Sequence, residues 1–147
     1  MKGLVPLLTL IVSLFGPRAG DAVTVQPMGL DRDDHYSIEY VVRAQLMAFR
    51  EDDVERAFTY VTPGIRERFR SAEAFVRMVR ESYPTVYRPG SVEFAEIRLT
   101  EHGAVQTVFI VGLDDAAVIA HFLLQRQASG DWRIAGCSLQ QSDARAA

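Results

Sequence analysis

The sequence has one cysteine, three histidines and, after Lys2, no lysine. A lone cysteine excludes an intramolecular disulfide, and Cys137 lies in the strand-like segment "WRIAGCSLQ", where we expect a buried apolar residue and not a nucleophile. Without lysine, Schiff-base chemistry and lysine-dependent phosphate loops are excluded. Because His35, His102 and His121 form no pair at metal-binding spacing, we expect no metal site and no cofactor.

The sequence also lacks a cluster of positive charge. It has 16 basic and 19 acidic residues, and its arginines are interspersed with acidic residues in "GIRERFR" and "FVRMVRE". Nucleic-acid binding needs a concentrated basic surface that neutralises phosphates, so no nucleic-acid partner is expected. A serine in a nucleophile-elbow context and a phosphate-cradling glycine pattern are missing as well.

Residues 1–22 have the pattern of a cleavable secretory signal peptide. Lys2 precedes an apolar run over Leu4–Phe15, a breaker follows, and small residues end at Ala22. The apolar run has about 12 residues, whereas a helix that spans a bilayer needs roughly 20. We therefore expect cleavage after Ala22, a periplasmic or secreted protein, and no membrane attachment after cleavage.

The rest of the chain is long enough for one domain of ordinary size. Residues 23–34 mix proline, glycine and acidic residues, which predicts a linker or extended arm. Residues 35–140 are predicted to form a single domain, and residues 141–147 a flexible tail. The domain opens with apolar residues at spacings of three and four, which predict a long helix over His35–Arg50 capped by Asp33 or Asp34.

Shorter helices and then strands are predicted after this long helix. "DDVERAFTYV", "TPGIRERF" and "SAEAFVRMVRESY" each begin with a capping residue, and Pro84 ends the last of them. Four strands joined by hairpin-length turns are expected at 86–99, 104–113, 116–127 and 132–140. Helices followed by an antiparallel meander predict an α+β fold with helices on one face of the sheet.

Both faces of the middle strands are apolar. In the strand predicted over 116–127, Phe122 and Leu124 alternate with Ile119 and Leu123. A sheet with one solvated face would instead alternate apolar with polar residues. Since the helices cover only one face, we expect a second subunit or a folded-back segment on the other, and a homodimer is the predicted assembly.

The helix and strand order resembles the cone-shaped, nuclear transport factor 2-like or cystatin-like superfamily. The segments "AQLMAFREDDVERAF", "FVRMVRESYPTVYRPGSVEF" and "WRIAGCSL" resemble, in order, the bacterial domain of unknown function 4864 over Tyr36–Leu139. The resemblance implies N-terminal helices packed on a curved, four-stranded antiparallel sheet. It implies no activity, because the superfamily contains isomerases, epoxide hydrolases, dehydratases and plain binding modules.

The candidate site is the cavity expected between the long helix and the sheet. Gln45 lies in the apolar stripe of the helix, which predicts either a hydrogen bond to backbone in the sheet or the next helix, or a polar anchor in a ligand cavity. Phe122 is expected to line the same cavity. Arg126 continues the alternation of Phe122, so it either enters the cavity as well or lies in solvent at the strand end. Tyr40 and Tyr83 offer hydroxyl groups, although aromatic residues at helical spacing are commonly core residues.

Two adjacent carboxylates, Asp52 and Asp53, invite an acid–base interpretation. Asp52 precedes Glu55 by three residues, which predicts a capping box, and Asp53 adds negative charge at the helix start. If Asp52 has a functional role, the helical projection predicts that it is the partner of Gln45.

The sequence therefore favours an exported, non-catalytic, dimeric binding module that holds a small apolar ligand. The alternative is an enzyme of the isomerase, dehydratase or hydrolase type with Gln45, Tyr83 and Arg126 around its cavity. A ligand-sized cavity with a carboxylate or histidine of shifted pKa beside these groups would favour the enzyme.

Overall fold

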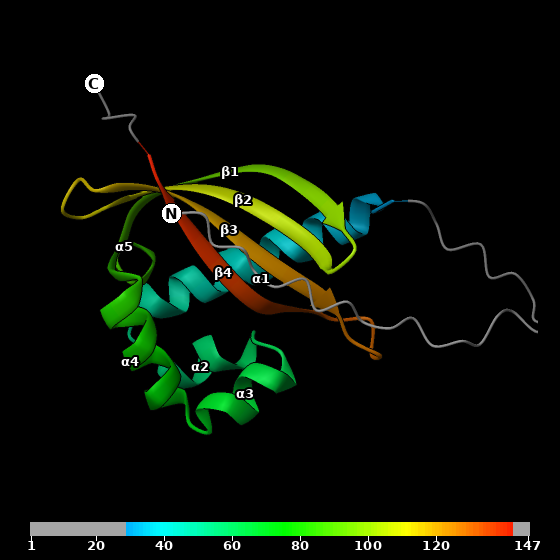
Figure 1. Cartoon of the computed structure of the whole chain (residues 1–147), viewed down its shortest axis with the longest axis horizontal. Helices are drawn as coiled ribbons and strands as arrows, with labels where there is room; N and C mark the ends of the chain where they lie inside the picture. The colour runs from blue at the N-terminus through cyan, green and yellow to red at the C-terminus, as the bar shows by residue number, and fades with distance from the viewer. Residues whose placement is uncertain (1–28, 143–147) are drawn as a thin grey trace, which may run out of the picture.

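The computed structural model describes residues 29–142, in which helices come first and strands follow (Figure 1). The helices are α1 (Arg32–Arg50), α2 (Val54–Thr59), α3 (Pro63–Phe69), α4 (Ala72–Ser82) and α5 (Pro84–Tyr87). The strands are β1 (Pro89–Thr100), β2 (Gly103–Gly112), β3 (Ala117–Arg126) and β4 (Trp132–Gln141). The predicted signal peptide, the first part of the predicted arm and residues 143–147 lie outside the described residues.

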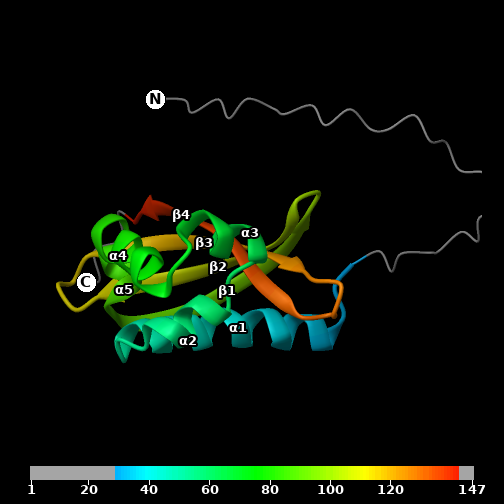
Figure 2. The same cartoon turned by 90° about the horizontal axis from the view of Figure 1, so that it is seen from below.

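The four strands form one antiparallel sheet in the order β1-β2-β3-β4, so each hairpin joins neighbouring strands. Helix α1 runs along one face of the sheet, whereas α2, α3 and α4 lie at the β4 side (Figure 2). The predicted α+β class, with N-terminal helices on a four-stranded antiparallel sheet, is confirmed. Among residues 29–142, no helix is long and apolar enough to cross a membrane.

Helix α1 begins at Arg32, three residues before the predicted start, because its cap is Asp31 and not Asp33 or Asp34. The Asp31 carboxylate accepts a hydrogen bond from the Asp34 backbone N–H at 2.8 Å, and the Asp34 carboxylate accepts one from the Asp31 N–H at 3.1 Å. This reciprocal pair is a capping box, which satisfies two backbone donors that a helix start leaves free.

The first predicted strand starts too early, because Pro84–Tyr87 forms the short helix α5. Proline disfavours helical geometry at the residue before it, which ends α4, but its fixed φ suits the first turn of a new helix. Val86 and Tyr87 are consequently buried in the core instead of lying in β1. The other strands begin and end within one residue of their predicted limits.

The core lies between α1 and the covered face of the sheet. Ile38 and Val42 of α1 are fully buried against residues from the middle strands, among them Val108, Ile110 and Leu124. The alternation predicted for β3 is confirmed, since Phe122 and Leu124 are buried whereas Ile119 and Leu123 are only partly buried. A one-residue slip in register would exchange these two sets, so the burial of one face fixes the strand pairing.

Candidate functional site

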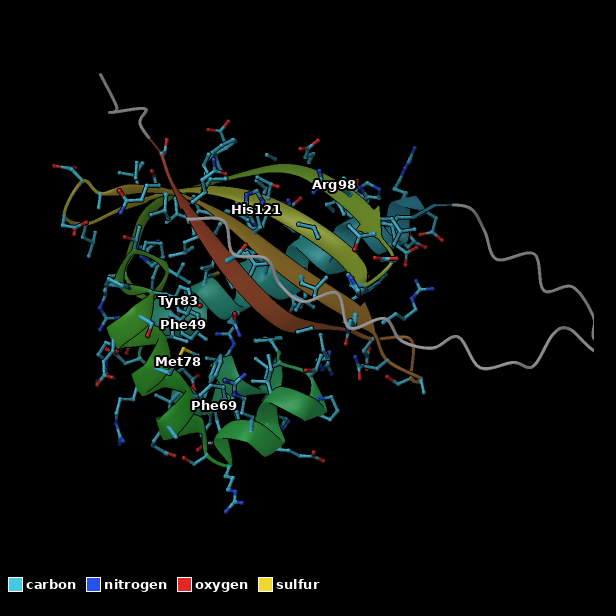
Figure 3. All side chains as sticks on the ribbon, in the orientation of Figure 1. Phe49, Phe69, Met78, Tyr83, Arg98 and His121 are labelled. Carbon is cyan, nitrogen blue, oxygen red and sulfur yellow. The ribbon has the colours of Figure 1, made fainter. Side chains whose placement is uncertain are left out.

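A cavity of about 270 Å³ lies between the C-terminal half of α1, helices α3 and α4, and strand β4. Its walls are mainly apolar and come from Phe49, Val61, Ile65, Phe69, Phe75, Met78, Val79 and Ile134. Figure 3 shows Tyr83, Phe49 and Met78 grouped beside α4, with Phe69 below them near α3. The cavity therefore occupies the space between the packed core and the small helices.

Local sequence patterns place these walls. Ser71 caps α4 by accepting a hydrogen bond from the Ala74 N–H at 3.1 Å, and the apolar face that follows presents Phe75, Met78 and Val79. The segment between α2 and α3 is fixed to β4, because Thr62 N–H donates to the Ile134 carbonyl at 2.9 Å. Helix α3 itself has no buried residue, so it closes the cavity without belonging to the core.

Gln45 is the buried polar group of the cavity, with only 2% of its surface exposed. Its Nε2 donates to the Ala57 carbonyl of α2 at 3.2 Å, which confirms the predicted hydrogen bond to the backbone of the next helix. A carbonyl only accepts, so the amide nitrogen must face Ala57 and Oε1 takes the other branch of the amide. Among residues 29–142 no hydrogen bond to this oxygen is present, and Gln106 Oε1, not Gln45 Oε1, is the fully buried side-chain atom without a partner, so Gln45 Oε1 keeps some contact with the open space of the cavity.

Three further polar side chains line the cavity: Tyr83, Arg68 and Cys137. Arg68 is exposed and is the one charged side chain among the described lining residues. Burial raises the pKa of the Cys137 thiol to about 12, so this group is neutral at ordinary pH. The lining residues within the described chain include no carboxylate and no imidazole, the groups that commonly serve as general acids and bases.

Of the five predicted site residues, two line the cavity and three lie elsewhere. Gln45 and Tyr83 line the cavity together. Phe122 is 1% exposed and belongs to the core instead. Tyr40 is 63% exposed and borders a separate, open depression near the start of α1.

Arg126 does not enter the cavity, which corrects that prediction. Its guanidinium forms an ion pair with the carboxylate of Asp34, and it lies 5.1 Å from the centre of the Trp132 ring. The same carboxylate accepts a hydrogen bond from the Trp132 indole N–H at 3.2 Å. Arg126 therefore joins the start of α1 to β3 and β4, a structural role at the end of the strand.

The predicted Asp52 capping box is wrong, because Asp53 caps α2 by accepting a hydrogen bond from the Arg56 N–H at 3.2 Å. Asp52 has φ 55°, a left-handed conformation that aspartate tolerates better than most residues. It is not the partner of Gln45: its carboxylate accepts from the Tyr87 hydroxyl and, at 2.7 Å, from Arg88. The pKa of Asp52 is lowered, chiefly by the hydrogen bond from Tyr87 and to a smaller extent by the hydrogen bond from Arg88.

The second face of the sheet carries no helix in the described structure (Figure 1). Val105, Phe109, Ile119 and Leu123 from β2 and β3 form an apolar surface on this outer face, and Phe109 is 42% exposed. His121 (labelled in Figure 3) lies among them, shares a hydrogen bond of 3.2 Å with Thr107 and does not line the cavity. Within residues 29–142 no group of three or more His, Cys, Asp or Glu side chains could hold a metal ion.

Helices on a four-stranded antiparallel meander define a cystatin-like fold. The chain is similar to a protein of unknown function with a cystatin-like fold from Nostoc punctiforme, with a TM-score of 0.55 and 11% identity, over 81% of this chain and 98% of that one. Residues 31–147 match the family described as domain of unknown function 4864, so the chain belongs to that family. No curated protein matches the sequence.

Sequence reasoning did not single out Arg68 and Phe69, although both line the cavity. The segment "GIRERFR" shows only a short helix with charges on several sides, and no pattern within it says which residue faces the core. Its position depends on the tertiary contact of Val61 with Ile134, a parallel bridge between residues 73 positions apart. A pairing at such separation leaves no local signal in the sequence.

Proposed function

We propose that this domain is a non-catalytic binding module that holds one small, mainly apolar molecule in the cavity between α1, α3, α4 and β4. The observation that carries the proposal is the cavity itself, with its volume of about 270 Å³ and largely apolar walls. An apolar cavity of about 150 Å³ accepts a benzene molecule, so this one has room for a two-ring compound or a medium-length acyl chain. Concave apolar sites with few polar groups are the usual form of small-molecule sites.

The chemistry of the lining favours binding over acid–base catalysis. Gln45 and Tyr83 are in place, but the third member of the enzyme hypothesis, Arg126, is paired with Asp34 elsewhere. General acid–base catalysis needs a group that exchanges protons near neutral pH, and the described lining side chains supply none. The neutral Cys137 thiol is a poor nucleophile for the same reason.

Fluorescence titration with 1-naphthol, a neutral two-ring fluorophore, tests the proposal. We expect saturable binding at one site. Met78→Trp fills the cavity and should abolish binding, whereas Met47→Trp makes the same change on an exposed part of α1 and should retain it. Equal binding by the two variants, or no saturable binding by the unmodified protein, would contradict the proposal.

A second proposal concerns the outer face of the sheet, which we expect to form a homodimer. The supporting observation is the pair of apolar patches, Val105 with Leu123 and Phe109 with Ile119, that flank Thr107 and His121 on this face. Such a surface is unusual on a monomer, and a two-fold dimer buries the same patch on both copies. Opposite charges on the neighbouring strand β1, Glu93 beside Phe109 and Arg98 beside Val105, would allow reciprocal ion pairs across the two-fold axis.

Gel filtration with light scattering tests the dimer. Phe109→Glu places a charge in one of the two apolar patches and should yield a monomer. Leu113→Glu changes an equally apolar side chain in the turn after β2, which is 72% exposed, and should leave the dimer intact. A monomeric unmodified protein at micromolar concentration would rule the dimer out.

We also propose that the protein is exported. The support is the signal-peptide pattern of residues 1–22. The intact mass of protein recovered from the periplasm should correspond to a chain that begins at Val23. Recovery of the uncleaved chain in the cytoplasm would contradict export.

A further inference from the structure

We infer that the molecule held in the cavity is an apolar organic acid whose apolar body carries one hydroxyl or N–H donor: Arg68 binds the acid group at the opening, and Gln45 accepts the donor inside. The inference rests on the proposed function, since it specifies the ligand of the same cavity. The acid end of the ligand would contact the exposed, charged Arg68, and the donor at the other end would contact the buried, neutral Gln45.

Arg68 is free to bind an anion. It is exposed, and its guanidinium carbon lies 5.8 Å from the centre of the ring of the adjacent Phe69. Within residues 29–142 no carboxylate lies within ion-pair distance of it. An arginine at the edge of an apolar cavity can pair with a carboxylate or sulfonate while water still solvates both charges, which avoids the cost of burying an ion.

Gln45 requires the opposite chemistry. Its Nε2 is committed to the Ala57 carbonyl, so the group it leaves for a ligand is the acceptor Oε1. Gln45 lines the cavity, so an apolar ligand that displaces water from Oε1 without offering a donor would leave this acceptor unsatisfied, which is unfavourable. A hydroxyl or N–H on the apolar body of the ligand would satisfy it.

The interior of the cavity does not suit the acid group. Apart from Gln45, its inner polar groups are the Tyr83 hydroxyl and the Cys137 thiol, and the high pKa of that thiol keeps it neutral. An ionised carboxylate placed among them would lose its hydration without gaining a counter-ion. The ligand therefore has one orientation, with its charge at Arg68.

Two matched probes test the role of Arg68. Naphthalene-1-sulfonate differs from naphthalene by one sulfonate group, and both are two-ring compounds. We expect the unmodified protein to bind the sulfonate about three- to tenfold more tightly at low salt. Arg68→Gln should remove this preference, whereas Arg66→Gln, on the same helix but outside the cavity, should keep it.

A second pair of probes, 1-naphthol and naphthalene, tests the role of Gln45. We expect the unmodified protein to favour the naphthol about fivefold, the effect of one hydrogen bond. Gln45→Met should bring the two affinities together, and Tyr83→Phe should leave the preference in place. Circular dichroism at the assay temperature establishes whether each variant is folded. If Gln45→Met does not fold, the test is whether the unmodified protein prefers 1-naphthol to naphthalene, and no preference would overturn the inference.

The outcomes separate this inference from the proposed function. If no probe binds saturably, the cavity is not a ligand site and both fail. If the neutral probes bind but the sulfonate and the hydroxyl add nothing, the proposed function stands and the inference is overturned. Loss of the naphthol preference in Tyr83→Phe would likewise overturn the assignment to Gln45.

Discussion

The buried carboxylate of Asp34 is expected to contribute more to stability than the exposed carboxylates of Asp31 and Asp33 at the start of α1. It accepts hydrogen bonds from the Asp31 N–H and the Trp132 indole, and it pairs with Arg126. A hydrogen bond from a buried donor to a charged acceptor contributes about 1.5–3 kcal/mol, and a helix cap about 1 kcal/mol. The ion pair adds little, because the Arg126 side chain is 51% exposed.

Asp34→Ala should therefore lower the free energy of unfolding by about 3 kcal/mol. Trp132 is the only tryptophan, so its fluorescence follows urea unfolding at this site, and circular dichroism provides a probe that the substitution does not touch directly. With a urea slope of about 2 kcal/mol/M, the midpoint should fall by about 1.5 M. Asp33→Ala, in the same turn but exposed, is the control and should lose less than about 1 kcal/mol. Equal losses in the two variants would refute the reasoning.

Three further predictions follow from the corrected assignments. Asp53→Ala should cost about 1 kcal/mol in chemical denaturation, because it removes the cap of α2, and an unchanged midpoint would contradict the assignment. Because the pKa of Asp52 is lowered in the folded protein, its carboxylate stabilises the fold above the ordinary pKa of 3.8, and this stabilisation is lost as the pH falls through the lowered pKa. The free energy of unfolding of Asp52→Asn should therefore fall less steeply in acid than that of the unmodified protein. Identical acid profiles would exclude that contribution. The Cys137 thiol, with its pKa raised from 9.0 to about 12, should react with iodoacetamide at pH 8 about a thousandfold more slowly than after unfolding, and rapid labelling of the folded protein would show that it is accessible and ionised.

Local patterns predicted the parts of the fold that local interactions determine. The repeat of apolar residues specified α1, and hairpin-length turns specified the order of the strands. The cap of α2 was assigned to the wrong residue because Asp52 and Asp53 both satisfy the local capping preference. The contacts that decide between them come from Tyr87 and Arg88, about 35 residues further along the chain.

The candidate site was predicted in part for a similar reason. Helical projection placed Gln45 toward the core, and the structure finds it there. Strand alternation gives the face of a residue but not what covers it, so it placed Phe122, which is buried in the core, and Arg126, which pairs with Asp34, in the cavity. Arg68 could not be assigned, because the position of α3 depends on the bridge between Val61 and Ile134.

The location of the cavity follows from how unequally the helices pack. Helix α1 has nine buried residues, whereas α3 has none. A densely packed interface leaves no room for a ligand. A cavity can therefore persist only where one of its walls is a helix that is not packed into the core. Such elements have low local stability, and binding sites are commonly built from them. Because Arg68 belongs to α3, which buries no residue, and Gln45 to α1, which buries nine, a ligand that contacts both would connect the two helices that differ most in packing.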